Sequence, residues 1–183
     1  MDTIFQTDLS ELKKYNNLEF FYGDITNLEY CREAMKDIDI ICHQAAMPSV
    51  PKSMKCPLFY HNVNVSGFIN ILEAAREKGI KRIVYASSSS VYGDDNSLPK
   101  MEGIIGKQIS PYAITKYIDE VYASMYTRLY GLECIGFRYF NVFGPRQRPD
   151  DSYAAVIPKF IDCILKQQAP TIYGDGSFTR DYT

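Results

Sequence analysis

The residues that decide the fold are Ile83-Val84-Tyr85-Ala86-Ser87-Ser88-Ser89-Ser90-Val91-Tyr92-Gly93, followed by Ser110-Pro111-Tyr112-Ala113-Ile114-Thr115-Lys116. The first stretch predicts a buried strand that ends in serines, and the second predicts a helix that starts after a polar loop at 94–109. Positions i and i+4 of a helix lie one turn apart on the same face, so we expect the Lys116 ammonium beside whatever the Tyr112 phenol approaches. The sequence therefore predicts a strand–loop–helix unit that gathers a serine, a tyrosine and a lysine.

These three residue types suit proton transfer. An unperturbed phenol has a pKa of about 10, and a nearby cation favours its ionised form. A shift of roughly three units corresponds to about 4 kcal/mol and gives a base that works near neutral pH. The Ser88 hydroxyl, at the end of the strand, could share the same proton. The alternative is an exposed helix with a surface pair, preceded by a strand-end turn.

Further strands and helices alternate on both sides of this unit. Strands are predicted at 18–22, 38–43, 81–86, 132–140 and 171–173, and helices at 27–36, 57–78, 111–130 and 153–166, with a loop at 47–56. Such alternation predicts an α/β fold with a doubly wound parallel sheet, in which ligands lie at the carboxyl ends of the strands. We expect Asp24, Ala45-Ala46, Ser88 and Asn141 at such ends.

The composition argues against several other classes of protein. The 183 residues suffice for one domain, and a net charge of -2 with dispersed Lys and Arg gives no electrostatic case for nucleic acid or an anionic membrane. No apolar run reaches the roughly 20 residues that a bilayer needs, and no signal pattern opens the chain, so we expect a cytoplasmic protein. Five widely spaced cysteines and only two histidines predict reduced thiols and no metal site.

The motifs resemble those of the extended short-chain dehydrogenase/reductase family over nearly the whole chain, and more closely its nucleotide-sugar epimerases. Besides the serine run and Tyr-x-x-x-Lys, the resemblance depends on Arg138-Tyr139-Phe140-Asn141-Val142-Phe143-Gly144-Pro145 and Ala154-Ala155-Val156-Ile157-Pro158-Lys159. It implies a Rossmann-like fold that binds NAD and a UDP-sugar. The match is greatest to the UDP-N-acetylglucosamine 4-epimerases, with the UDP-glucuronate 4-epimerases as the alternative.

The resemblance also implies roles for individual residues. The implied catalytic residues are Ser88, Tyr112 and Lys116. The implied cofactor contacts are Asp24, Ile25, Gln44, Ala45, Ala46 and Tyr139, together with Tyr112 and Lys116. The implied substrate contacts are Ser49, Ser88, Ser89, Ser90, Asn141, Ala155, Val156 and Arg180. Because serines rather than an acid follow Ser88, only redox at one sugar carbon is supported.

Several of these residues have plainer interpretations. Asp24 could form a turn through its own side chain or cap a helix. His43 is expected to be a packed strand residue and His61 a residue of the helix surface or an interface. The apolar faces of the helices at 57–78 and 111–130 are most simply core, but in the family they also pair into a homodimer.

The glycine-rich turn that holds the pyrophosphate in this family has no counterpart here, since no Gly-x-x-Gly-x-x-Gly occurs. By comparison with the family, residues 1–183 are expected to be an internal fragment, truncated at both ends. They would form a partial NAD-binding domain, with a substrate-binding region that starts at about 141–183. The strand at 18–22 would then lack a partner, the strand at 38–43 would be an open edge, and the fragment alone would be inactive.

Overall fold

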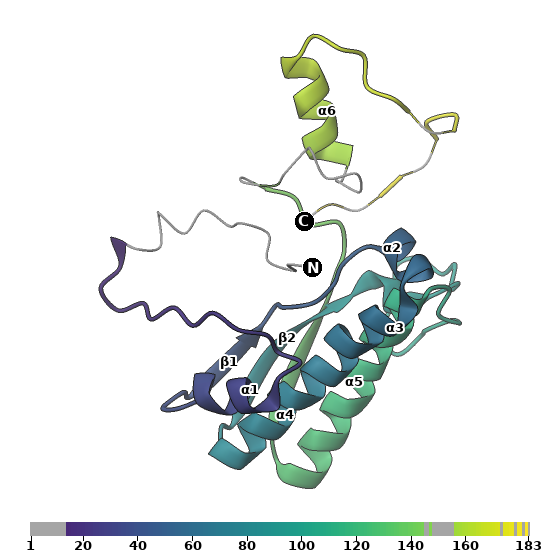
Figure 1. Cartoon of the computed structure of the whole chain (residues 1–183). Coiled ribbons are helices and arrows are strands. Elements are labelled where there is room, and N and C mark those ends of the chain that lie inside the picture. Colours follow the sequence, from purple (N-terminus) through teal and green to yellow (C-terminus); the bar gives the residue numbers. More distant parts are fainter. Residues whose placement is uncertain are drawn as a thin grey trace.

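The computed structural model describes residues 14–144, 147, 156–172, 174–177, 179–180 and 182. Three strands, β1 (Ile40–His43), β2 (Arg82–Ser88) and β3 (Glu133–Tyr139), form a parallel sheet in the order β1-β2-β3 (Figure 1). The register places Ile41 beside Ile83 and Ile83 beside Cys134. Because helices connect successive strands, this is the parallel α/β fold that the sequence predicts.

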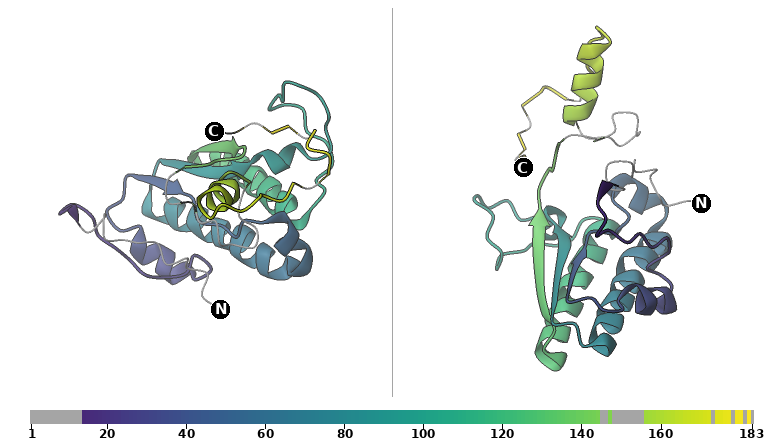
Figure 2. Two further views of the ribbon diagram at one scale, coloured as in Figure 1. Left: turned by 90° about the horizontal axis from the view of Figure 1, so that it is seen from above. Right: turned by 90° about the vertical axis from the view of Figure 1, so that its left-hand side faces the viewer.

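One face of the sheet is covered by helices α1 (Leu28–Ala34), α4 (Gly67–Lys78) and α5 (Pro111–Tyr130) (Figure 2, right). Side chains alternate along a strand, so Ile83 and Tyr85 point into this layer and pack with Phe68 of α4. Leu72 and Ile83 are completely buried. Each such side chain contributes about 1.5–3 kcal/mol of hydrophobic stabilisation.

A glycine makes room for one core aromatic residue. A Cβ at Gly136 of β3 would lie 2.5 Å from the Tyr85 ring of β2. The phenol of Tyr85 therefore occupies the space that a side chain at position 136 would need, and this keeps β2 and β3 in their observed register.

The opposite face of the sheet carries exposed apolar side chains, and we call it the open face. On β3 it consists of Ile135, Phe137 and Tyr139, which are 37–49% exposed, and the rings of Phe137 and Tyr139 stack at 6.1 Å. On β1 it includes Ile40, which is 57% exposed. Within the described part of the chain, no helix covers this face (Figure 2, right).

The predicted strand at 18–22 is wrong. These residues have no strand pairing, and Phe20 and Tyr22 are 60% and 70% exposed. A strand is stable only when a neighbour satisfies its backbone groups, and in the described residues none lies beside this segment. Among the described residues β1 pairs with β2 alone, which agrees with the open edge predicted for this strand.

Two helical predictions need correction. The predicted loop at 47–56 contains a short helix, α2 (Val50–Lys55), which Ser49 caps by accepting a hydrogen bond from the Lys52 amide. The predicted helix at 57–78 is present but not uniform: α3 (Pro57–Tyr60) leads into a π-helical segment, η2 (His61–Ser66), and then into α4. Apolar periodicity does not distinguish a π turn from an α turn, so the π-helical segment could not be predicted from it.

Towards the carboxyl terminus, α6 (Val156–Leu165) confirms most of the helix predicted at 153–166, whose residues 153–155 lie outside the described residues. The predicted strand at 171–173 is not present at Thr171 and Ile172, and Tyr173 is outside the described residues. Figure 1 shows α6 beyond the carboxyl ends of the strands, apart from the sheet.

Candidate active site

The serine run lies where β2 ends. Ser88 is its last residue, is buried, and accepts a hydrogen bond from the Ser90 amide at 3.1 Å, which starts the 3₁₀ turn η3 (Ser89–Tyr92). Ser87 points to the other side and donates to Glu120 of α5. Ser89 and Ser90 are half-buried. The strand therefore delivers the Ser88 hydroxyl to its carboxyl end, as predicted.

Helix α5 begins close to this edge with strong start signals. Ser110 caps it by accepting from the Ala113 amide at 3.1 Å, and Pro111 occupies the first turn. The amide of Tyr112 donates to the Ser53 hydroxyl of α2 at 3.1 Å, which docks the two helices together. Tyr112 is half-buried, whereas Lys116, one turn later, is 2% exposed.

The Lys116 ammonium is held by an aspartate that the sequence analysis overlooked. Its Nζ donates to Asp119 Oδ2 at 2.9 Å, and the Asp119 side chain is 1% exposed. Burial raises the pKa of Asp119 to about 6, although the ammonium acts in the opposite direction. Asp119 Oδ1 has no hydrogen-bond partner in the described part of the chain.

His43 ends β1 next to this pair. Its ring packs on Phe68 at 5.2 Å, and burial, aided by the Lys116 charge, lowers the pKa of His43 to about 4. His43 is therefore neutral at physiological pH and behaves as the packed strand residue that the sequence predicts. His61 lies exposed in η2.

A buried asparagine, also missed from the sequence, ties the site together. Asn64 of η2 accepts from the Met47 amide at 2.7 Å and donates to the Thr115 hydroxyl at 3.0 Å. Thr115 in turn donates to the Tyr112 carbonyl at 2.8 Å. Asn64 thus links the loop after β1 to the first turn of α5. Asn62 and Ser66 beside it are also polar, so no signal in the sequence singles out Asn64.

The predicted cofactor residues near the amino terminus have mixed surroundings. Asp24 is exposed and accepts from the Thr26 amide at 2.9 Å, so it forms the turn that its plainer interpretation expects, and it does not follow a strand. Ile25 packs on the core. Gln44 and Ala45 are exposed and Ala46 is half-buried just after β1.

The remaining predicted residues lie after β3. Tyr139 ends β3 on the open face, and Asn141, two residues later, forms an isolated bridge with Tyr182. Val156 begins α6, and Arg180 is exposed and donates to the Thr179 carbonyl at 2.7 Å. Ala155 lies outside the described residues.

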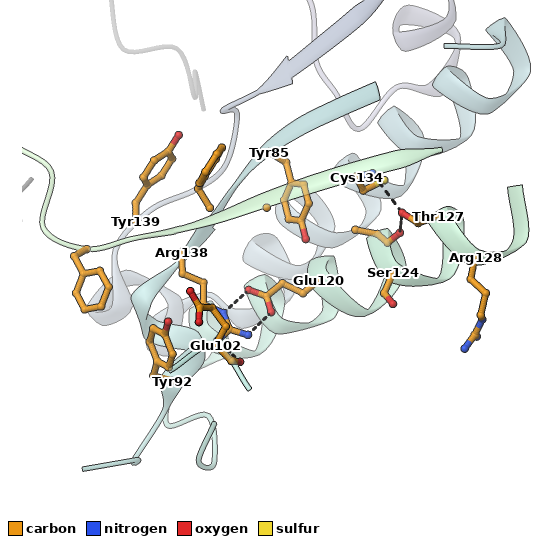
Figure 3. Close-up of a pocket in the computed structure, with 14 residues that line it drawn as sticks. Tyr85, Tyr92, Glu102, Glu120, Ser124, Thr127, Arg128, Cys134, Arg138 and Tyr139 are labelled. Carbon is orange, nitrogen blue, oxygen red and sulfur yellow. Dashed lines mark hydrogen bonds and ion pairs between the residues drawn. The ribbon is translucent and has the colours of Figure 1, made fainter. Parts of the chain in front are cut away.

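A broad cleft runs between α5 and β3 (Figure 3). Inside it the Arg138 guanidinium binds both carboxylate oxygens of Glu120, at 2.9 and 2.8 Å, and lies 4.8 Å from the centre of the Tyr92 ring. Among the described residues that were predicted for the site, Tyr139 alone lines this cleft. The cleft is therefore adjacent to the predicted proton-transfer residues and separate from them.

Two classes of site receive no support from the described residues. They contain no cluster of three His, Cys, Asp or Glu side chains that could hold a metal ion. None of the helices in the described ranges is both long enough and apolar enough to cross a membrane.

A parallel sheet that brings a serine to a strand end, followed by a helix with Tyr-x-x-x-Lys, defines a short-chain dehydrogenase/reductase type of protein. The chain belongs to the NAD dependent epimerase/dehydratase family, whose model matches residues 4–183. NAD is the cofactor of this family.

Individual relatives agree with this assignment. A putative UDP-glucose 4-epimerase of Methanocaldococcus jannaschii is 42% identical over 99% of this chain and 61% of that protein. The UDP-N-acetylglucosamine 4-epimerase of Methanobrevibacter ruminantium, solved with UDP-N-acetylmuramic acid, superposes with a TM-score of 0.88 and 40% identity, over 92% of this chain and 54% of that one.

A third relative differs in its substrate. The UDP-glucuronic acid 4-epimerase of Bacillus cereus, solved with UDP-glucuronic acid and NAD, gives a TM-score of 0.85 and 32% identity over 96% of this chain and 54% of that one. The chain thus spans about half to three fifths of the length of these relatives.

Proposed function

We propose that the protein containing this chain is an NAD-dependent UDP-sugar 4-epimerase of the UDP-N-acetylglucosamine/UDP-glucose type. The observation that carries the proposal is a buried Lys116 one helical turn after a half-buried Tyr112, on the helix that follows the strand ending in Ser88. Relatives that are 4-epimerases of UDP-sugars support it.

The residues present fit the two ends of NAD and leave its pyrophosphate without a binding turn. Ala45 and Ala46 leave the carboxyl end of β1 without bulky side chains, and Tyr112 and Lys116 offer a hydroxyl and an ammonium to a ribose. We assign Asp24 and Ile25 to the adenine end and Gln44 and Tyr139 to the nicotinamide side. No glycine-rich turn for the pyrophosphate occurs in the sequence, so we expect this chain alone to bind NAD weakly.

When bound, NAD supplies a reversible hydride acceptor for C4 of the sugar. The residues of this chain manage the proton. The Tyr112 phenolate accepts the proton of the sugar 4-hydroxyl, while Ser88 donates a hydrogen bond to the same oxygen. After the 4-keto sugar has rotated, Tyr112 returns the proton to the same 4-oxygen, and the hydride returned to the opposite face of the sugar would invert C4. The Lys116 ammonium favours the phenolate form of the tyrosine.

We further assign sugar and nucleotide contacts to Ser49, Ser89, Ser90, Asn141, Ala155, Val156 and Arg180. Residues from about 141 to 183 then begin a substrate-binding region. An arginine suits a diphosphate because its guanidinium presents paired donors to phosphate oxygens.

The activity is tested by incubating the complete protein with UDP-N-acetylglucosamine, UDP-glucose or UDP-glucuronate and resolving the products by chromatography. We expect interconversion at C4 of the first two. Turnover of the uronate alone would favour the UDP-glucuronate 4-epimerase alternative, which the Bacillus cereus relative supports. The absence of any turnover would contradict the proposed function.

For the isolated 183-residue chain we propose no catalysis, since it lacks the pyrophosphate turn. Measuring the NAD that copurifies with the chain tests this. We expect none, and stoichiometric NAD together with epimerisation would show the proposal to be wrong. A cytoplasmic location stays a prediction.

We also propose a homodimer through the helices at 57–78 and 111–130. Ile114, Val121 and Leu129 of α5 are 46%, 52% and 59% exposed and recur about every seven residues, so they form one apolar stripe. Sedimentation of the complete protein tests the dimer. Val121→Lys is expected to give a monomer, and an unchanged dimer would exclude this surface.

A further inference from the structure

The proposed mechanism leaves one buried ionisable group in α5 without a role. Asp119 lies three residues after Lys116, and both side chains are almost completely buried, with 1% and 3% exposed. Buried charges normally occur in pairs, because an isolated charge loses its hydration without compensation.

The other groups around the ammonium do not replace Asp119. His43 of β1 is neutral and lies close enough for its pKa to be lowered by the Lys116 charge. Glu120, the next residue of α5, is engaged by Ser87 of β2 and Arg138 of β3. The Tyr85 phenol of β2 is uncharged, because burial raises its pKa. In the described part of the chain, the hydrogen bond of Lys116 goes to Asp119.

The helical spacing places the Lys116–Asp119 pair on the same face of α5 as Tyr112. Tyr112, Lys116 and Asp119 occupy positions i, i+4 and i+7, which share one helix face. The ammonium therefore lies between the turn that carries the phenol and the turn that carries the carboxylate. A carboxylate at this position acts on the ammonium directly and on the tyrosine only through it.

We propose that Asp119 is a positioning residue, which holds the Lys116 ammonium on the Tyr112 face of α5 and keeps it protonated in a site nearly closed to solvent. This inference rests on the proposed function of Tyr112 and Lys116. A single charged pair of this kind is a poor source of stability, because desolvation offsets most of the attraction. Its effect is on the charge state of the site.

The experiment compares Asp119→Asn with Glu29→Gln in the complete protein. Glu29 forms an ion pair with Arg32 at the same i, i+3 spacing, but on the surface, with its side chain 76% exposed. Titration of the Lys116 side chain is followed by NMR of its Cε carbon, with the signal assigned by its loss in Lys116→Met. In Asp119→Asn we expect the ammonium to lose its proton about one pH unit or more below the wild-type titration. In Glu29→Gln we expect no change.

A second readout is the pH profile of epimerisation, whose alkaline limb should move to lower pH in Asp119→Asn only. A Lys116 titration that is the same in Asp119→Asn and the wild type would overturn the inference, even if the enzyme remains an epimerase. A shifted titration in a protein that epimerises no UDP-sugar would instead refute the proposed function and leave the pairing intact.

If Asp119→Asn does not fold, the double variant Lys116→Met/Asp119→Asn decides the question. Recovery of the fold in the double variant would show that the uncompensated ammonium caused the failure, as the inference requires. Failure of the double variant, with Lys116→Met alone folded, would show that Asp119 acts independently of Lys116 and would overturn it.

Discussion

The side-chain amide of Asn64 donates a hydrogen bond to the Thr115 hydroxyl at 3.0 Å, across 51 residues of sequence. On its other side the same amide group exchanges two hydrogen bonds with the backbone of Met47. The π-helical segment η2 thereby fixes the loop after β1 and the start of α5 relative to each other. Both segments carry residues assigned to the cofactor.

Replacing Asn64 by Ala is therefore expected to destabilise the fold by about 1–3 kcal/mol, because it leaves buried partners unsatisfied. The matched control is Asn62→Ala, in the same π-helical segment but exposed, which should change the free energy of unfolding by about 0.5 kcal/mol or less. Urea denaturation followed by circular dichroism measures both. Equal losses of stability in the two variants would contradict the role of Asn64 in holding Met47 and Thr115 together.

Removing the Tyr112 hydroxyl is expected to abolish most activity without affecting the fold. In the described residues the Tyr112 backbone, not its hydroxyl, makes the hydrogen bonds to Ser53 and Thr115. Tyr112→Phe should lower kcat by about 10²–10⁴-fold, the usual contribution of a general acid–base. Tyr117→Phe, a half-buried tyrosine of the same helix, is the control. Substantial activity in Tyr112→Phe would require another base.

The stability contributed by His43 is expected to decrease at acid pH. The folded state holds the pKa of His43 at about 4, while in the unfolded chain the imidazole takes up a proton below about pH 6.5. The unfolded state therefore binds more protons between these values, and up to about 3 kcal/mol is lost as the pH falls from 6.5 to 4. His43→Gln removes this loss, so urea denaturation should show a higher stability at pH 4.5, relative to that at pH 6.5, in His43→Gln than in the wild type.

Asp119 is expected to act in the opposite direction. Its folded pKa of about 6 lies above the ordinary value of about 3.9, so between these values the folded state binds more protons and gains stability as the pH falls. The two slopes largely cancel in the wild type. Acidification should therefore stabilise His43→Gln and destabilise Asp119→Asn. The same slope in both variants would contradict the opposite pKa shifts of His43 and Asp119.

Gly136→Ala is expected to destabilise the fold by about 1–3 kcal/mol, because the added methyl group would lie 2.5 Å from the ring of the buried Tyr85. Gly103→Ala is the control, since a Cβ there meets no atom within 4 Å. Thermal unfolding followed by circular dichroism compares the two. A neutral Gly136→Ala would mean that β2 and β3 can shift to accommodate the methyl group.

The sequence predicted those parts of the fold whose local pattern and long-range environment agree. Helix α5 has Ser110 and Pro111 at its start and Gly131 in the left-handed conformation at its end, so its bounds were recognisable. The segment at 18–22 has an equally good strand pattern, but strand formation depends on a neighbour, and the resemblance to the family already implied that this neighbour would be missing. The π turns of η2 were not recognisable, because apolar periodicity does not distinguish a π turn from an α turn.

The candidate site was predicted by residue type, and its supporting contacts were missed. Ser88, Tyr112 and Lys116 stand out because their chemistry and spacing are unusual together. Asn64 and Asp119 are ordinary polar residues in helices, and only burial reveals their importance. The i, i+3 spacing of Asp119 after Lys116 was visible, but an exposed pair with the same spacing, such as Glu29 and Arg32, looks no different in sequence.

The open face formed by Ile40, Ile135, Phe137 and Tyr139 has a practical consequence for these measurements. Dyes that fluoresce on apolar surfaces will bind the folded chain through this face. A dye-based thermal shift assay of the 183-residue chain should therefore start from a high signal and show a weak rise on heating. Circular dichroism avoids this artefact.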